Sequence, residues 1–211
     1  MVIAGARALS LSRSVRRRAK IVRVIARTLR HYEIGMNQEG TMLTILQAET
    51  PDQIATVREL MMEYATWLEF NLCFQGFDEE LRTLPGKYAA PRGRLLLASW
   101  DNQIAGLGAL RPLSDDDVCE MKRLYVRPAF RGHNIGRILA RKLISDACAI
   151  GYRSMRLDTV PGKMDQAIAL YRELGFKEMA PYYNSPVDKT MFMELMLPWH
   201  DSASTPKAVG Q

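Results

Sequence analysis

Residues 131–136 read Arg131-Gly132-His133-Asn134-Ile135-Gly136, a short polar loop with two glycines. The loop follows a strand-like run, Val118 to Val126, that stops before Pro128. It opens a helical run, Gly136 to Ile150, whose apolar residues recur on one face and which Gly151 ends. Met155 to Val160 is again strand-like. The order of strand, loop, helix and strand predicts a parallel β-α-β unit with a right-handed crossover.

The loop has the properties of an anion site. Free backbone N–H groups at the start of a helix, with the positive end of its dipole, attract phosphate. Gly132 and Gly136 carry no side chain, which leaves room for a diphosphate near the backbone. The loop is neither a Walker loop nor a G-x-G-x-x-G fingerprint. A plain strand-to-helix turn with solvated arginines is the alternative. The nearby cationic or donor side chains are those of Arg127, Arg131, His133 and Arg137.

The chain around this unit predicts a mixture of strands and helices. Thr50-Pro51-Asp52-Gln53 has the pattern of a capping box at the start of a helix. Asp101-Asn102 predicts a hairpin turn, and Gly106 and Gly108 indicate a bulge or a weak strand after it. Gly175 predicts a left-handed helix end. The remaining predicted strands are 42–48, 95–100, 103–110, 176–179 and 191–197, and the remaining predicted helices are 51–68, 78–84 and 164–174.

The net charge of +6 comes from one end of the chain. Residues 1–40 hold nine of the 29 Lys and Arg residues but only two of the 23 acids, so residues 41–211 hold 20 bases and 21 acids. We therefore expect a basic arm over 1–40, disordered or helical, one domain over 41–198, and a polar tail over 199–211. The near-neutral domain makes nucleic acid an unexpected partner except through the arm.

The arm has the pattern of a basic amphipathic helix. From Val15 to Leu29, apolar residues recur every three or four positions, and basic residues share that spacing one position later. Such a segment is typical of an organelle-targeting peptide, of a helix that lies on a membrane surface, or of an RNA-binding tail. Alternatively it is disordered, or it lies upstream of the true start, because Met36 and Met42 both precede the first clear strand. We expect the domain to stay folded without residues 1–40.

Other features exclude several classes of protein. No run of about 18 apolar residues exists, so a membrane-spanning helix is not expected. Cys73, Cys119 and Cys148 are scattered and lack Cys-x-x-Cys spacing. We expect neither a disulfide framework nor a metal site, and we expect a reducing, cytoplasmic location unless the arm directs the chain to an organelle. The acidic run 115–117 is predicted to be a solvated turn.

Two stretches resemble GNAT acyltransferases, which use acetyl-CoA to acylate amines. The family's R-x-x-G-x-G/A signature is similar to Arg131, Asn134 and Gly136, which follow the similar stretch 119–128. Its A-x-x-L-Y-x-x-x-G-F stretch is similar to residues 167–176. The resemblance is strong over 94–180, extends by element order over 42–197, and does not cover the arm. It implies an α/β fold: a mixed, mostly antiparallel central sheet with a parallel β-α-β cofactor-binding unit and helices on both faces.

The resemblance also implies how acetyl-CoA would bind. Its diphosphate would lie on the backbone amides of 131–136, and its pantetheine arm would pair with the edge of 124–126. Two positions depart from the family pattern. Asn134 replaces a glycine, although Asn tolerates the left-handed region best after Gly. Met164 replaces an Asn that helps to hold the cofactor. The implied cofactor-binding residues are Leu124, Tyr125, Val126, Arg131, Gly132, His133, Asn134, Ile135, Gly136 and Arg137.

Two residues are candidates for catalysis. Tyr171 matches the family's tyrosine that protonates the leaving thiolate, with packing in the core as the alternative. Glu120 is the candidate base, directly or through water, with an ion pair to Lys122 or Arg123 as the alternative. A backbone N–H near Tyr125 or Val126 would polarise the thioester carbonyl. Cys119 raises a covalent route, but no histidine lies near it in the sequence.

We interpret the chain as an acetyl-CoA-dependent N-acetyltransferase that acts by direct transfer to a primary amine. The acceptor is a small molecule or a peptide, and a homodimer is possible from the resemblance. Aromatic residues at 181–186 and around Trp67 are candidates for the acceptor pocket or for structural packing. Two alternatives remain: a non-catalytic acyl-CoA-binding module, and a protein- or RNA-associated acetyltransferase that uses the arm.

Overall fold

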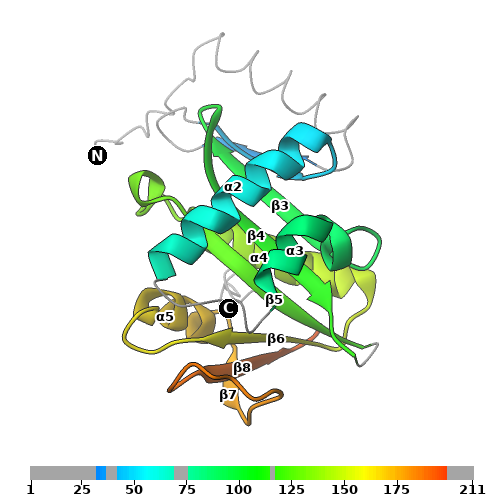
Figure 1. Cartoon of the computed structure of the whole chain (residues 1–211), viewed down its shortest axis with the longest axis vertical. Helices are drawn as coiled ribbons and strands as arrows, with labels where there is room; N and C mark the ends of the chain where they lie inside the picture. Colours follow the sequence, from blue (N-terminus) through cyan, green and yellow to red (C-terminus); the bar gives the residue numbers. More distant parts are fainter. Residues whose placement is uncertain (1–31, 37–41, 69–75, 115–116, 199–211) are drawn as a thin grey trace, which may run out of the picture.

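The computed structural model describes residues 32–36, 42–68, 76–114 and 117–198. These residues build an eight-stranded sheet in the order β1-β2-β3-β4-β5-β6-β8-β7 (Figure 1). Only β5 and β6 pair in parallel among the described strands; the other neighbours are antiparallel. The predicted mixed sheet with one parallel unit is therefore confirmed. The strands are β1 (Tyr32–Met36), β2 (Met42–Gln47), β3 (Arg94–Trp100), β4 (Gln103–Pro112), β5 (Val118–Val126), β6 (Ser154–Thr159), β7 (Lys177–Met179) and β8 (Met191–Met196).

Helices cover both faces of the sheet, as predicted. In Figure 1, α2 and α3 lie in front of the sheet and α4 lies behind it. The helices are α2 (Pro51–Leu68), α3 (Phe77–Thr83), α4 (Ile135–Ile150) and α5 (Asp165–Glu173), with short 3₁₀ helices η2 (Gly86–Tyr88) and η3 (Pro128–Phe130). No helix of the described ranges is both long and apolar enough to cross a bilayer.

The two faces of the sheet form two separate cores. On β3, Leu95 and Leu97 pack with the α2 face, whereas Leu96 and Ala98 pack with α4. A strand sends successive side chains to opposite faces, so a strand buried on both faces reads as an uninterrupted apolar run. The run Leu95-Leu96-Leu97-Ala98 is this pattern.

Several local predictions are confirmed. The capping box forms, since the Gln53 N–H donates to Thr50 Oγ1 at 3.3 Å and the Thr50 N–H donates to Gln53 Oε1 at 3.0 Å. Asp101 and Asn102 both adopt positive φ, 46° and 64°, as a tight hairpin between β3 and β4 requires. Gly175 ends α5 with φ at 94°.

A bulge interrupts the pairing of β4 with β5 near the predicted glycine. Leu107 pairs with Tyr125 and Ala109 pairs with Lys122, so β5 holds one extra residue opposite Gly108. Arg123 is this extra residue, and its φ of 56° lies in a region that a non-glycine residue seldom adopts. The bulge therefore turns the β5 backbone in the middle of the sheet.

One boundary was predicted wrongly. Tyr32–Met36 pairs with β2 as the edge strand β1, so the sheet begins before residue 41. The five residues include Glu33 and Gly35, which strands disfavour, and the basic segment before them hid their alternation. The helical interpretation of the arm, residues 115–116 of the acidic run and the tail 199–211 lie outside the described residues. Asp117 does lie at the surface, in an ion pair with Arg153.

The edge strand gives a testable boundary. We expect a chain that lacks residues 1–31 to melt like the full chain, because all eight described strands remain. Removing 1–40 deletes β1 and should lower the melting temperature by about 3 °C or more, since each cross-strand pair contributes a few tenths of a kcal/mol. Calorimetry on both truncated chains checks this. Equal melting temperatures for the two would show that β1 adds no stability.

Candidate active site

The site lies where β5 and β6 separate. The two strands pair only at Val118, Cys119 and Glu120, although β5 continues to Val126. Beyond Glu120 no described strand pairs with this edge of β5, so its backbone N–H and C=O groups need other partners. A hollow of about 530 Å³ follows this edge. Its lining also includes the start of α4, the loop 162–166 before and at the start of α5, and Trp67 from α2.

The structure brings together nine of the ten predicted cofactor residues. These nine line the hollow: Leu124, Tyr125, Val126, Arg131, Gly132, Asn134, Ile135, Gly136 and Arg137. The tenth, His133, is not among the lining residues, and its ring packs against Trp100 in a tilted arrangement, with 4.7 Å between centroids. Apart from His133, the loop 131–136 therefore forms one wall of the hollow.

The loop has the geometry of an anion site. Asn134 adopts the left-handed region with φ at 60°, as expected for an asparagine in place of glycine. It precedes α4 and makes no side-chain cap to the first helical amides. Gly132 also has positive φ, at 87°, and a Cβ there would meet nothing within 4 Å. The first amides of α4 thus point to the hollow without a side chain that blocks them.

The cations around the loop are arranged differently from the predicted ring. Arg127 makes a bidentate ion pair with Glu63 at 2.6 and 2.9 Å. Arg137 pairs with Glu173 on α5. Arg131 donates to the Val126 carbonyl at 3.2 Å and lies over the Trp67 ring at 5.1 Å. Two of the predicted phosphate-binding arginines are therefore already held by carboxylates.

The loop motif does not predict two of the residues that line the hollow, Trp67 and Lys163. Trp67 comes from α2, far away in the sequence, and Lys163 also lies over its ring, at 5.6 Å. Met164, the second departure from the family pattern, accepts a hydrogen bond from the Thr159 hydroxyl at 3.6 Å. Met164 fills its position with a flexible apolar chain in place of an amide donor.

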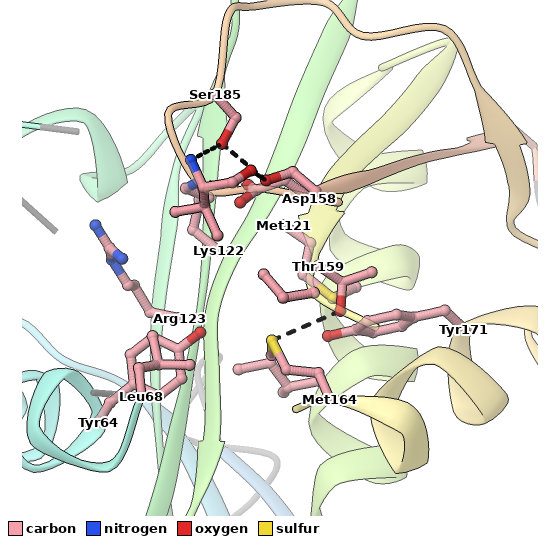
Figure 2. Close-up of a pocket in the computed structure, with 14 residues that line it drawn as sticks. Tyr64, Leu68, Met121, Lys122, Arg123, Asp158, Thr159, Met164, Tyr171 and Ser185 are labelled. Carbon is pink, nitrogen blue, oxygen red and sulfur yellow. Dashed lines mark hydrogen bonds and ion pairs between the residues drawn. The ribbon is translucent and has the colours of Figure 1, made fainter. Parts of the chain in front are cut away.

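A smaller cavity of about 50 Å³ adjoins the hollow and shares Leu124 and Met164 with it (Figure 2). Its walls come from α2, β5, β6, α5 and the loop before β8. The polar lining residues include a basic pair on β5, an acid on β6 and several hydroxyls: Tyr64, Lys122, Arg123, Asp158, Thr159, Tyr171, Ser185 and Thr190.

Two tyrosines face this cavity from opposite sides. Tyr64 extends from α2 and Tyr171 from α5, and in Figure 2 both hydroxyls point towards the space between them. Both side chains are buried. Burial raises the pKa of Tyr171 well above its usual value and raises the pKa of Tyr64 to about 12. Both phenols are therefore protonated near neutral pH and able to donate.

Glu120 is buried in an ion cluster and is not among the residues that line the cavity. It accepts from Arg111 at 2.7 Å and from the Tyr182 hydroxyl at 2.6 Å. The alternative ion pair with Lys122 is present at 3.6 Å, whereas Arg123 turns to Glu80 instead. This geometry favours a role for Glu120 in positioning Lys122.

The carboxylate that does line the cavity is Asp158, which the sequence analysis missed. It accepts from Lys122 Nζ at 2.6 Å and from the Tyr183 hydroxyl. Burial alone would raise the pKa of Asp158, but the Lys122 ammonium and the Arg123 charge together hold it below its usual value. Asp158 therefore lies in the cavity as a carboxylate.

The bulge residue Arg123 is held from the α3 side. Its guanidinium donates to both Glu80 oxygens, at 2.6 and 3.0 Å, and lies 5.0 Å from the centre of the Phe77 ring. Glu80 also accepts from the Tyr88 hydroxyl at 2.6 Å. Because Arg123 is almost fully buried, this pair fixes the bulge beside the cavity.

The covalent route through Cys119 has no support in the structure. Its thiol is fully buried, and burial raises its pKa to about 12, so the thiol is not ionised at neutral pH. The described residues also contain no group of three or more His, Cys, Asp or Glu side chains that could hold a metal ion.

Comparison with known proteins agrees with this geometry. The model of the acetyltransferase (GNAT) family matches residues 55–176. An uncharacterized N-acetyltransferase of Schizosaccharomyces pombe is 36% identical over 154 residues, which are 72% of this chain and 94% of that protein.

Solved structures give the same fold. An acetyltransferase from Streptococcus agalactiae has a TM-score of 0.62 at 20% identity, over 74% of this chain and 98% of that one. The yncA structure from Salmonella typhimurium, which contains its cofactor acetyl-CoA, has a TM-score of 0.52 at 23% identity, over 79% and 98%. The chain therefore belongs to the GNAT family of N-acetyltransferases.

Proposed function

We propose that the domain, residues 32–198, moves an acetyl group from acetyl-CoA to a primary amine by direct transfer. One observation carries the proposal: the large hollow along β5 and the small cavity share Leu124 and Met164, with Tyr171 beside that junction. A thioester in the hollow and an amine in the cavity can therefore meet at one point.

The residues of the hollow fit acetyl-CoA. Of the predicted amides 131–136, that of Arg131 already donates to the Pro128 carbonyl, so those of 132–136 would hold the diphosphate, and Asn134 makes no side-chain cap that competes for them. The edge of β5 at Leu124, Tyr125 and Val126, where the pairing with β6 has ended, would bond the amide-containing pantetheine arm. A backbone N–H beside the bulge, at Tyr125 or Val126, would polarise the thioester carbonyl.

The residues of the cavity can carry the proton transfers. The neutral amine attacks the carbonyl carbon of the thioester, so a C–N bond forms and the C–S bond breaks. Asp158 accepts the proton from the nitrogen, which is strongly acidic once it has bonded to the carbonyl carbon. Tyr171 gives its proton to the departing sulfur and regains one through solvent. The products are an N-substituted acetamide and a free thiol.

Replacing Tyr171 by phenylalanine tests this assignment. We expect turnover to fall on the order of a hundredfold, because the departing sulfur loses its acid, while the dissociation constant for acetyl-CoA stays nearly unchanged. Acetyl-CoA-dependent thiol release over a panel of amines gives the turnover, and calorimetric titration gives the affinity.

Tyr152→Phe is the matched control, since the Tyr152 hydroxyl donates to the Arg92 carbonyl, and neither residue lines the hollow or the cavity. Unchanged turnover in Tyr171→Phe would remove Tyr171 from the acid role. Tight acetyl-CoA binding with no thiol release for any amine would favour a binding module over an enzyme.

A further inference from the structure

The cavity beside Tyr171 contains an ion pair that is almost closed to solvent. The Lys122 side chain is 4% exposed and that of Asp158 is 15% exposed, and 2.6 Å separates Lys122 Nζ from Asp158 Oδ1. Both residues line the cavity (Figure 2). A ligand that separates this pair must supply a partner to both charges, because a buried charge that loses its partner is strongly unfavourable.

A second polar group is available on the opposite wall. Tyr64 is 8% exposed, and none of the described residues forms a hydrogen bond with its hydroxyl. A buried hydroxyl is usually bonded, so a hydroxyl that opens onto a cavity without a partner is suited to a ligand. By contrast, the hydroxyls of Ser185 and Thr190 bond to each other at 2.8 Å.

We propose that the acceptor is a small amine that also carries a carboxylate, that is, a zwitterion of the amino-acid type. This rests on the proposed function. The acceptor's carboxylate pairs with Lys122, and its ammonium pairs with Asp158 and lies near the Tyr64 hydroxyl. The two buried charges thus exchange one partner for another, and none is left unpaired.

The charges of the cavity favour an acceptor that carries both signs. Its charged lining residues are Lys122, Arg123 and Asp158, and the carboxylates of Glu80 and Glu120 lie against Arg123 and Lys122, so the buried cluster holds no excess of positive charge. A polyamine offers no carboxylate to Lys122, whereas a zwitterion offers a partner to both Lys122 and Asp158. The ammonium is the bound form, and it releases one proton to solvent before the neutral amine attacks the thioester.

The cavity volume of about 50 Å³ points to a small acceptor. A short side chain on the amino acid suits this space, and a long polar one does not.

The test uses the full chain and pairs of acceptors that differ only in the carboxylate. Thiol release from acetyl-CoA is measured with glycine against glycinamide and L-alanine against L-alaninamide, with putrescine alongside. We expect kcat/KM to be at least about tenfold higher for each free acid than for its amide, and putrescine to be the poorest. Equal or better turnover of the amides or of putrescine would overturn this inference but leave the acetyltransferase intact. Absence of turnover with every amine would contradict the proposed function as well.

A pair of variants tests the proposed role of Lys122. Lys122→Met should raise KM for the free acid about tenfold or more, with little change in KM for acetyl-CoA or for the amide. Lys177→Met is the matched control, because Lys177 is exposed on β7. An equal rise in KM for the free acid and for the amide in Lys122→Met would overturn the assignment of Lys122. If Lys122→Met does not fold, the comparison of acid with amide in the unaltered protein still decides the inference.

Discussion

Replacing Gly136 by aspartate should abolish the binding of acetyl-CoA, with the dissociation constant raised more than about 100-fold, or about 2.8 kcal/mol. Gly136 is the second residue of α4 and lines the hollow beside the amides proposed to hold the diphosphate. A carboxylate there would repel the phosphates and accept the same amide hydrogens. Calorimetric titration with acetyl-CoA measures the loss.

Two features separate this effect from damage to the fold. A Cβ at Gly136 would lie 3.7 Å from Val126 Cγ2, an ordinary contact, so Gly136→Ala should bind acetyl-CoA nearly as the native chain does. The first turn of α4 has no acid, so the aspartate should keep or slightly raise the melting temperature through the helix dipole. Retained affinity in Gly136→Asp would show that the diphosphate does not lie on this loop.

Removing the Glu80 carboxylate should lower the free energy of unfolding by about 3–5 kcal/mol in Glu80→Ala. The change leaves Arg123 buried without its bidentate partner, at a backbone position with positive φ. Tyr88 loses its acceptor too. Urea unfolding followed by tryptophan fluorescence measures the free energy of unfolding.

A double variant and a pH series provide the controls. Glu80→Leu with Arg123→Met removes both charges and should recover part of the stability that Glu80→Ala loses. Burial alone would raise the pKa of Glu80, but the hydrogen bond and charge of Arg123 hold it below its usual value. The stability from this group is therefore present above about pH 4.5 and lost as pH falls through the lowered pKa. Glu80→Ala should show a smaller acid-dependent loss than the native chain, and an equal loss would argue against the pair.

The β-α-β unit could be predicted because its signals are contiguous. The strand, the loop 131–136 and the helix follow one another, so glycine positions and apolar spacing were enough to predict them. The positive φ of Asn134 was expected from the resemblance, which places a glycine there, and from the tolerance of asparagine for the left-handed region.

The acceptor side could not be predicted in the same way, because tertiary packing assembles it. Tyr64 on α2 and Asp158 on β6 come together only when β5 and β6 separate. The local pattern around Glu120 fits the predicted base, and only the folded structure shows that its carboxylate accepts from Arg111 and Tyr182. The sequence does not indicate which neighbouring side chain a polar residue of a strand will contact.

The two cores on opposite faces of the sheet have an evolutionary consequence. Residues of the α2 cluster touch β3 and β4 on one face, and those of the α4 cluster touch them on the other. Drift in α2 and α3 can therefore reshape the acceptor side while the face that packs α4 keeps its shape. A lineage with this architecture can diversify the molecules it modifies and still draw on the same metabolic donor.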